Sequence, residues 1–251
     1  MLPNTMNEGC YGRLFPADKM YVFVNGVVTG ANMTESIEAL TYMREAHAHH
    51  FRSDGQRYEV HPLSMACYAL SLRALSGGQD SPIDDATIAT IATILLHDVP
   101  EELNIAVESM PFTDEVLRGV KYMTISERFP GETKFEQKRR YANELLECWR
   151  SVICKGADMY YNFSTMLPTF SEDKIRKNVV EADLLRMPVL KRAKRKYPKL
   201  RPLLWIMREN ITMLLHVYAM QYKVKLTDPN YINPPDAKDY SYLITGEKPV
   251  E

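Results

Sequence analysis

Apolar residues recur every three or four positions along most of the chain, the spacing that places them on one face of an α-helix. Residues 88–95 show this pattern clearly, ahead of a break at Pro100. Ser171 is a favourable helix cap, and Pro188 predicts a kink in the helix that follows it. The pattern predicts helices that begin near residues 34, 62, 85, 114, 134, 150, 172 and 200, the last ending near residue 225.

The N-terminal segment has a different pattern. Residues 20–24 and 27–29 are rich in β-branched and aromatic side chains, and they flank Asn25 and Gly26. Asn-Gly between two such runs predicts a β-hairpin. We therefore expect an all-α helical bundle with a small N-terminal β-hairpin. Its expected parts are an N-terminal extension (1–33), a helical domain (34–200), and a C-terminal helix and irregular tail packed on that domain (201–251).

The composition is that of an ordinary globular domain, with 45% apolar and 25% charged residues. The formal net charge of −1 argues against duplex nucleic acid as a partner, because such binding needs a basic field. No apolar run reaches the roughly 18 residues of a membrane span, and the N-terminus lacks the pattern of a signal peptide. We expect a cytoplasmic protein without a membrane contact, and the oligomeric state stays open.

Two histidines and two aspartates are the candidate metal ligands. They are His61 at the start of the second predicted helix, the adjacent His97 and Asp98 at the end of the third, and Asp158 in a later helix. Such a set, with nitrogen and oxygen ligands but no sulfur, suits Mn²⁺, Fe²⁺ or Mg²⁺ better than a closed structural zinc site. An adjacent His-Asp pair alone is weak evidence, because most such pairs are surface or capping residues.

Three segments strengthen the metal interpretation: residues 46–62, 95–102 and 153–166. The first holds the most specific pattern, Phe-Arg-x-x-Gly-x-x-Tyr-x-x-His-Pro, which runs from Phe51 to Pro62. In this order the three segments resemble the hydrolase domain of the RelA/SpoT family, including its small stand-alone alarmone hydrolases. The likeness covers about residues 38–200.

The resemblance implies the all-helical HD fold and a manganese-dependent enzyme. In that family, the reaction removes the 3′-pyrophosphate from guanosine tetra- or pentaphosphate. The four candidate ligands match the family's metal ligands. Glu101 and Glu102 match the acidic pair that handles the attacking water and the leaving oxygen, although the family usually has Asp at the second position.

The resemblance also implies nucleotide-binding residues. Arg52 matches the residue that stacks on the purine, and Asn162 and Thr165 match residues that hold the nucleotide. Asn162 and Thr165 follow the candidate aspartate ligand by four and seven positions, so one helical face carries all three. We also expect Ser53 and Lys155 to contact the phosphorylated nucleotide.

The chain departs from the family pattern at several cationic positions. Ser53 replaces a basic residue, residues 159–161 replace an Arg-Leu-His run, and Ser164 replaces a common arginine. Fewer cations weaken the grip on a pyrophosphate group. Two alternatives therefore stay open: the same chemistry on an adenosine alarmone, NADPH or a deoxynucleotide, and a non-catalytic nucleotide-binding protein.

Overall fold

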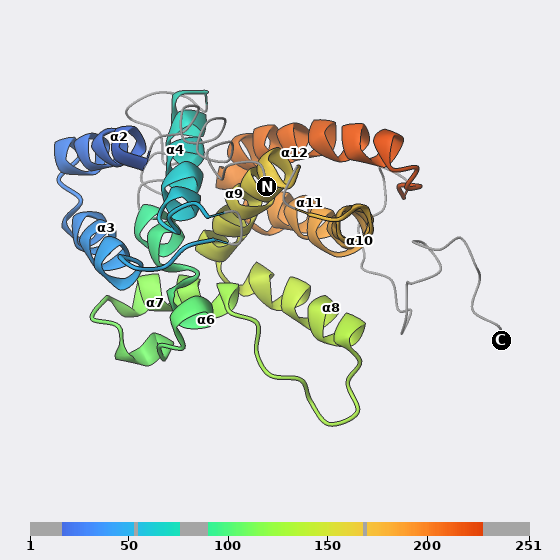
Figure 1. The fold of residues 1–251 in the computed structure, drawn as a ribbon, viewed down its shortest axis with the longest axis horizontal. Helices are drawn as coiled ribbons and strands as arrows, with labels where there is room; N and C mark the ends of the chain where they lie inside the picture. The colour runs from blue at the N-terminus through green and yellow to red at the C-terminus, as the bar shows by residue number, and fades with distance from the viewer. Residues whose placement is uncertain (1–16, 53–54, 76–89, 168–169, 228–251) are drawn as a thin grey trace, which may run out of the picture. The chain divides into compact units, whose positions relative to one another are not determined.

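The computed structural model describes residues 17–52, 55–75, 90–167 and 170–227 of the 251-residue chain. The regular structure of these residues is helical, as predicted, and their one β-type contact is an isolated bridge between Phe51 and Arg57. The chain divides into two compact units, residues 1–124 and 125–251 (Figure 1).

The first unit begins with α2 (Ala17–Gly30), α3 (Thr34–Ala46) and α4 (Val60–Leu75). Residues 90–96 are helical, and a turn at residues 97–98 leads into the short α6 (Val99–Leu103). The 3₁₀ turn η2 (Val107–Ser109) and α7 (Asp114–Met123) complete the unit. The predicted start of the third helix, near residue 85, lies outside the described residues. Pro100 stands in the first turn of α6, where its missing N–H costs nothing.

The hairpin predicted around Asn25 and Gly26 is wrong, because both residues lie inside α2. Met20, Val24 and Val28 recur every four residues, and all three are buried where α2 packs against α3 and α4. Burying each such side chain contributes about 1.5–3 kcal/mol, which outweighs the local turn preference of Asn-Gly. The prediction used local β-propensity and overlooked this helical period.

The second unit consists of α8 (Lys134–Glu144), η3 (Leu145–Glu147), α9 (Trp149–Thr165), α10 (Glu172–Glu181), η4 (Ala182–Arg186), α11 (Met187–Lys196), η5 (Pro198–Leu200) and α12 (Arg201–Gln221). The long α9 lies at its centre and packs along α12 and against α11. Ser171 caps α10 as predicted, since its hydroxyl accepts a hydrogen bond from the Lys174 N–H. A π-helical turn, η4, interrupts the regular helix just before Pro188.

The close contact of α9 with α12 depends on a glycine. A Cβ added to Gly156 would lie 1.9 Å from the Sδ of Met207, which is itself fully buried. The two helices therefore approach closely at this point, and a side chain at position 156 would have to displace the Met207 thioether.

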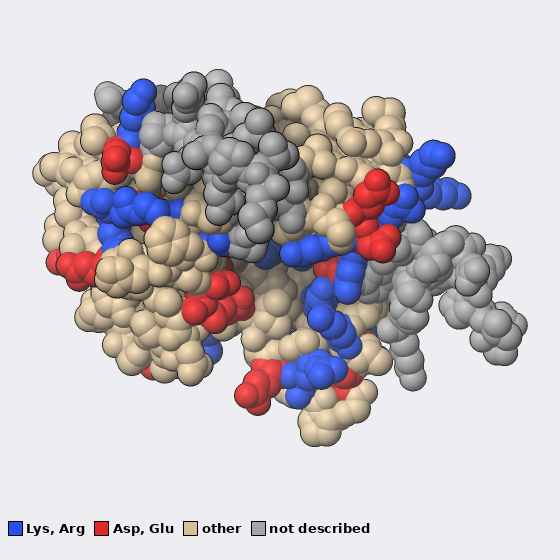
Figure 2. All heavy atoms as spheres, in the orientation of Figure 1, with Lys and Arg blue, Asp and Glu red and all other residues tan. Residues whose placement is uncertain are grey.

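The surface of the described residues mixes both signs of charge. On the face shown in Figure 2, Lys and Arg side chains lie among Asp and Glu side chains. Within the described ranges, no helix is long and apolar enough to cross a membrane.

We expect Gly156→Ala to lower the free energy of unfolding measured in urea. Overpacking a dense core costs about 1–3 kcal/mol of stability. The higher helix propensity of alanine offsets only about 1 kcal/mol of that cost. Gly26→Ala is the matched control, because Gly26 also lies in a helix but has no atom within 4 Å of an added Cβ. The control should gain about 0.5–1 kcal/mol. A similar gain in both variants would contradict the close packing at Gly156.

Candidate metal centre

Two buried histidines of the first unit point their Nε2 atoms at one carboxylate. His61 is the second residue of α4, and His97 lies in the turn after the helical residues 90–96; each is only 3% exposed. The Oδ2 of Asp98 lies 3.2 Å from the His61 Nε2, and its Oδ1 lies 2.9 Å from the His97 Nε2. The structure therefore brings these three predicted ligands together within one unit.

The Asp98 carboxyl is ionised in this setting. Burial alone would raise its pKa, but the charge of His97 and the hydrogen bonds from His61 and His97 hold the pKa well below its usual range. Asp98 also stands at the N-terminus of α6. The sequence placed it at the unfavourable end of the preceding helix, whereas the N-terminus of a helix favours a negative charge.

The tautomer of His97 indicates what must lie between its Nε2 and the Asp98 carboxylate. Its Nδ1 lies 2.8 Å from the carbonyl oxygen of Ile94, which only accepts, so the Nδ1 carries a proton. In the neutral ring the lone pair is then on Nε2, opposite a carboxylate oxygen that also only accepts. Two acceptors this close need either a protonated ring or a shared cation. The donor set therefore fits a divalent metal ion held by His61, His97 and Asp98.

A stack of three rings supports Asp98 from the side of α3. The ring of Tyr58 lies nearly parallel to those of His47 and His50, at 4.5 and 4.4 Å between centroids. The Tyr58 hydroxyl donates a 2.7 Å hydrogen bond to the Asp98 Oδ2. Burial and the Asp98 charge raise the pKa of Tyr58, so the hydroxyl keeps its proton. Burial and the neighbouring His50 lower the pKa of His47 to about 4, so this ring is neutral at pH 7.

The loop that carries Tyr58 is fixed by a buried acid. Glu59 is 3% exposed and lies between two arginines, 2.9 Å from the Arg44 Nε and 2.8 Å from an Arg57 nitrogen. The loop turns at Gly55, whose φ of +83° favours glycine. Sequence reasoning assigned no role to Tyr58 or Glu59, although both lie inside the segment that carries the family pattern.

The predicted acidic pair lies on α6, one turn after Asp98. Glu101 and Glu102 are both exposed, and the Glu102 carboxylate lies 3.6 Å from the His50 Nε2. The Glu102 N–H donates to the Asp98 carbonyl, which fixes the register of the pair relative to Asp98. The guanidinium carbon of Arg52 lies 5.9 Å from the Tyr58 ring centroid. Ser53 lies outside the described residues.

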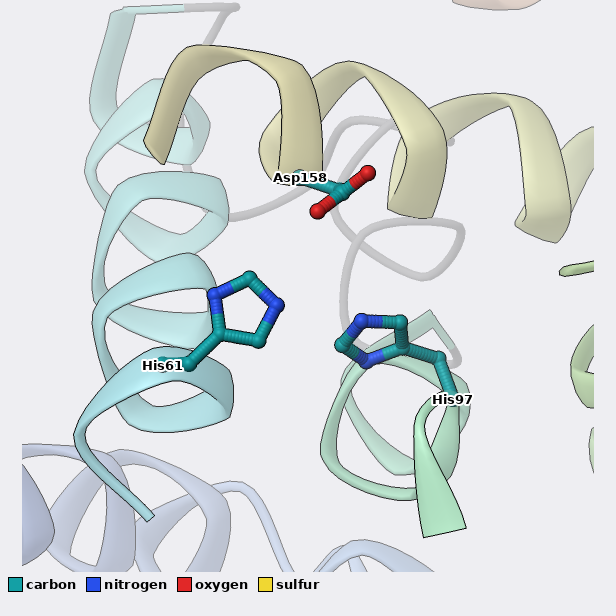
Figure 3. Close-up of side chains that lie close together, drawn as sticks. All are labelled: His61, His97 and Asp158. Atoms are coloured by element: carbon teal, nitrogen blue, oxygen red, sulfur yellow. The ribbon is translucent and has the colours of Figure 1, made fainter. Parts of the chain in front are cut away.

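The fourth predicted ligand belongs to the second unit. Asp158 projects from α9 and is 7% exposed. Figure 3 draws the side chains of the three candidate ligands His61, His97 and Asp158 as sticks. Lys155 lies 2.8 Å from the Asp158 Oδ2, and the Asn162 amide donates a 2.6 Å hydrogen bond to the Asp158 Oδ1. Burial alone would lower the pKa of Lys155, but the Asp158 charge raises it.

All three residues of the predicted polar face, Asp158, Asn162 and Thr165, lie on α9. Asp158 and Asn162 touch, as their spacing requires. Thr165 differs, because its hydroxyl donates to the Tyr161 carbonyl of its own helix, 2.9 Å away. Thr165 is the last residue of α9, where such a bond stabilises the helix end.

No protein-family model matches the chain.

Proposed function

We propose that the chain is a metal-dependent phosphohydrolase of the HD type that removes the 3′-pyrophosphate from guanosine tetraphosphate. The observation that carries the proposal is the convergence of the His61 and His97 Nε2 atoms on the Asp98 carboxylate. All three residues lie in segments with the family pattern. Two buried imidazoles and a half-buried carboxylate, with one ring held by a backbone carbonyl, have the usual architecture of such metal ligands.

The proposed metal is Mn²⁺, with Fe²⁺ and Mg²⁺ as alternatives. When bound, such an ion lowers the pKa of a water molecule and neutralises charge on a phosphoryl group. We propose a hydrolase domain of residues 34–200 with Asp158 as its fourth metal ligand. Lys155 and Asn162 support this role because they hold the Asp158 carboxylate in one orientation.

In the proposed reaction, two glutamates carry out the two proton transfers. Water attacks the phosphorus attached to the 3′ oxygen, the bond from phosphorus to that oxygen breaks, and GDP and pyrophosphate are the products. One glutamate of the pair Glu101 and Glu102 accepts a proton from the water, and the other donates one to the leaving oxygen. Both are exposed to solvent and lie one helical turn from Asp98, as this role requires. His50 beside Glu102 orients that carboxylate.

Arg52, Lys155 and Asn162 are the proposed nucleotide contacts. Arg52 offers a planar cation for a purine face, and Lys155 offers a charge to a phosphate. The hydroxyls of Thr165 and Ser164 donate to backbone carbonyls of α9, so they would contribute less to nucleotide binding. This observation favours a second candidate, the same reaction type on another phosphorylated nucleotide.

Metal binding tests the proposed centre directly. We expect the full chain to bind Mn²⁺ in isothermal titration calorimetry, and Asp98→Ala and Asp158→Ala each to weaken binding by more than about 100-fold. Asp114→Ala, an exposed aspartate on α7, is the control and should bind like the parent. Normal binding by Asp158→Ala would remove that residue from the centre. Failure of the parent to bind any of Mn²⁺, Fe²⁺ and Mg²⁺ would end the proposal.

Product analysis tests the reaction. We expect the manganese-loaded protein to convert guanosine tetraphosphate to GDP and pyrophosphate, resolved by anion exchange, and Glu101→Gln to lower the rate by about 10²–10⁴-fold. Parallel incubations contain the adenosine counterpart, NADPH and dGTP. Turnover of one of these alone would move the assignment to that nucleotide. Metal binding without turnover of any would favour a binding protein.

Removing the Tyr58 hydroxyl tests how Asp98 is held. Tyr58→Phe keeps the ring stack and removes only the hydrogen bond to Asp98, so we expect Mn²⁺ affinity to fall by about 10–100-fold. Tyr42→Phe is the matched control, because the Tyr42 ring packs on Phe112. Equal affinity in both variants, with an unchanged melting temperature, would contradict this role for Tyr58.

A further inference from the structure

One stretch of the second unit carries charge of a single sign. Residues 184–208 contain nine Lys and Arg residues and no Asp or Glu, in a chain whose formal net charge is −1. The stretch covers α11, η5 and the start of α12, and these three elements pack against one another. This stretch, which spans the corner between α11 and α12, therefore carries a local excess of positive charge.

Some of these cations have partners inside the unit. Arg192 donates to the Asn143 side chain, Lys196 pairs with Glu147, and Arg208 pairs with Glu209. Four others have no acidic side chain within ion-pair distance in the described part of the chain. We call these four the cationic corner: Lys194, Arg195, Lys199 and Arg201.

Lys194 lies near two other members of the cationic corner, Arg195 and Arg201, and their charges repel its own. Partial burial lowers the pKa of Lys194, and Arg208, Arg201 and Arg195 lower it further, against the opposing effect of Glu209. Lys194 of α11 therefore faces the stretch of α12 from Arg201 to Glu209. Like charges gathered without counter-ions destabilise the folded chain, and an anionic partner would remove that cost.

An exposed tryptophan lies within the same stretch of α12. Trp205 is 54% exposed, and it follows Arg201 by one turn and precedes Arg208 by three residues. These positions share one helical face, the face that approaches Lys194. A large aromatic ring in water among cations offers two chemistries, a charge for a phosphate and a flat surface for a base.

We propose that the cationic corner and Trp205 form a binding surface for single-stranded nucleic acid. Phosphates pair with the corner, and a base stacks on the indole ring. A paired duplex hides the faces of its bases, so the tryptophan selects unpaired strands. Charge alone would serve any polyanion, and the exposed ring is what favours a nucleic acid. The surface is independent of the proposed metal centre.

The test uses the full chain and a fluorescein-labelled oligouridylate of roughly 12 nucleotides, followed by fluorescence anisotropy. We expect saturable binding whose affinity falls with rising salt. A duplex of the same length should bind more weakly. Asp98→Ala should bind like the parent, which separates this surface from the proposed enzyme. No binding at low salt, or equal binding of duplex and single strand, would overturn the proposal.

Two variants then locate the surface. The double variant Lys199→Ala/Arg201→Ala should weaken binding and reduce the slope of log affinity against log salt by about 1.4, two phosphate contacts of about 0.7 each. Lys223→Ala/Lys225→Ala, which removes two exposed lysines after α12, is the matched control and should bind like the parent. Equal losses in both double variants would show a diffuse charge effect and overturn the proposal.

Trp205→Leu separates base stacking from charge. It should weaken oligouridylate binding by at least about fivefold, the low end for one stacked base, and leave the affinity for heparin unchanged. Titration of the parent should also quench tryptophan fluorescence, and this quenching should shrink in the variant. Equal weakening for heparin and for the oligonucleotide would contradict a stacked base and leave only a general polyanion surface.

Discussion

The contact between the Asp98 carboxylate and two imidazoles is the interaction on which the rest of the site depends. One carboxylate faces His61 from α4 and His97 from the preceding turn, and it receives the Tyr58 hydroxyl as well. Two segments that are distant in sequence, residues 58–61 and 97–98, are therefore held together at this carboxylate. An ionised group costs several kcal/mol to bury without partners. The surrounding hydrogen-bond donors offset that cost. They also hold the carboxylate in the orientation that a shared metal ion would need.

Pattern reasoning predicted the helical class and most helix positions, because apolar periodicity records which face of each helix is buried. It failed at residues 20–29. There the Asn-Gly pair favoured a hairpin, while the apolar residues of the same stretch also recurred at helical spacing. Local propensity is worth a few tenths of a kcal/mol per residue, and burial of Met20, Val24 and Val28 is worth several times more. The sequence shows the turn signal directly, and the partner helices that bury this face are visible only in the structure.

His61, His97 and Asp98, which the structure brings together, could be named from the sequence because the chemistry of a metal site restricts residue types. The residues that hold these ligands in place could not be predicted in this way. Tyr58 and Glu59 act through contacts set by the turn at Gly55, and such contacts leave no periodic trace. The hydroxyl of Thr165 shows the converse: its position on α9 was right, and its hydrogen bond turned out to go to the backbone. Spacing gives the face of a helix, and the local competition for hydrogen bonds decides what a side chain on that face does.

The shortness of α6 has a consequence for how the acidic pair behaves in time. A helix of five residues has no stability of its own in water, because nucleation costs more than so few hydrogen bonds return. It exists here because Val99 and Pro100 are buried and because α6 packs against α3. Glu101 and Glu102 therefore sit on a segment that can open locally while the rest of the first unit stays folded. The backbone amides of α6 should then exchange with solvent faster than those of α3 and α4, and the acidic pair would be in place only for the fraction of time that this turn is closed.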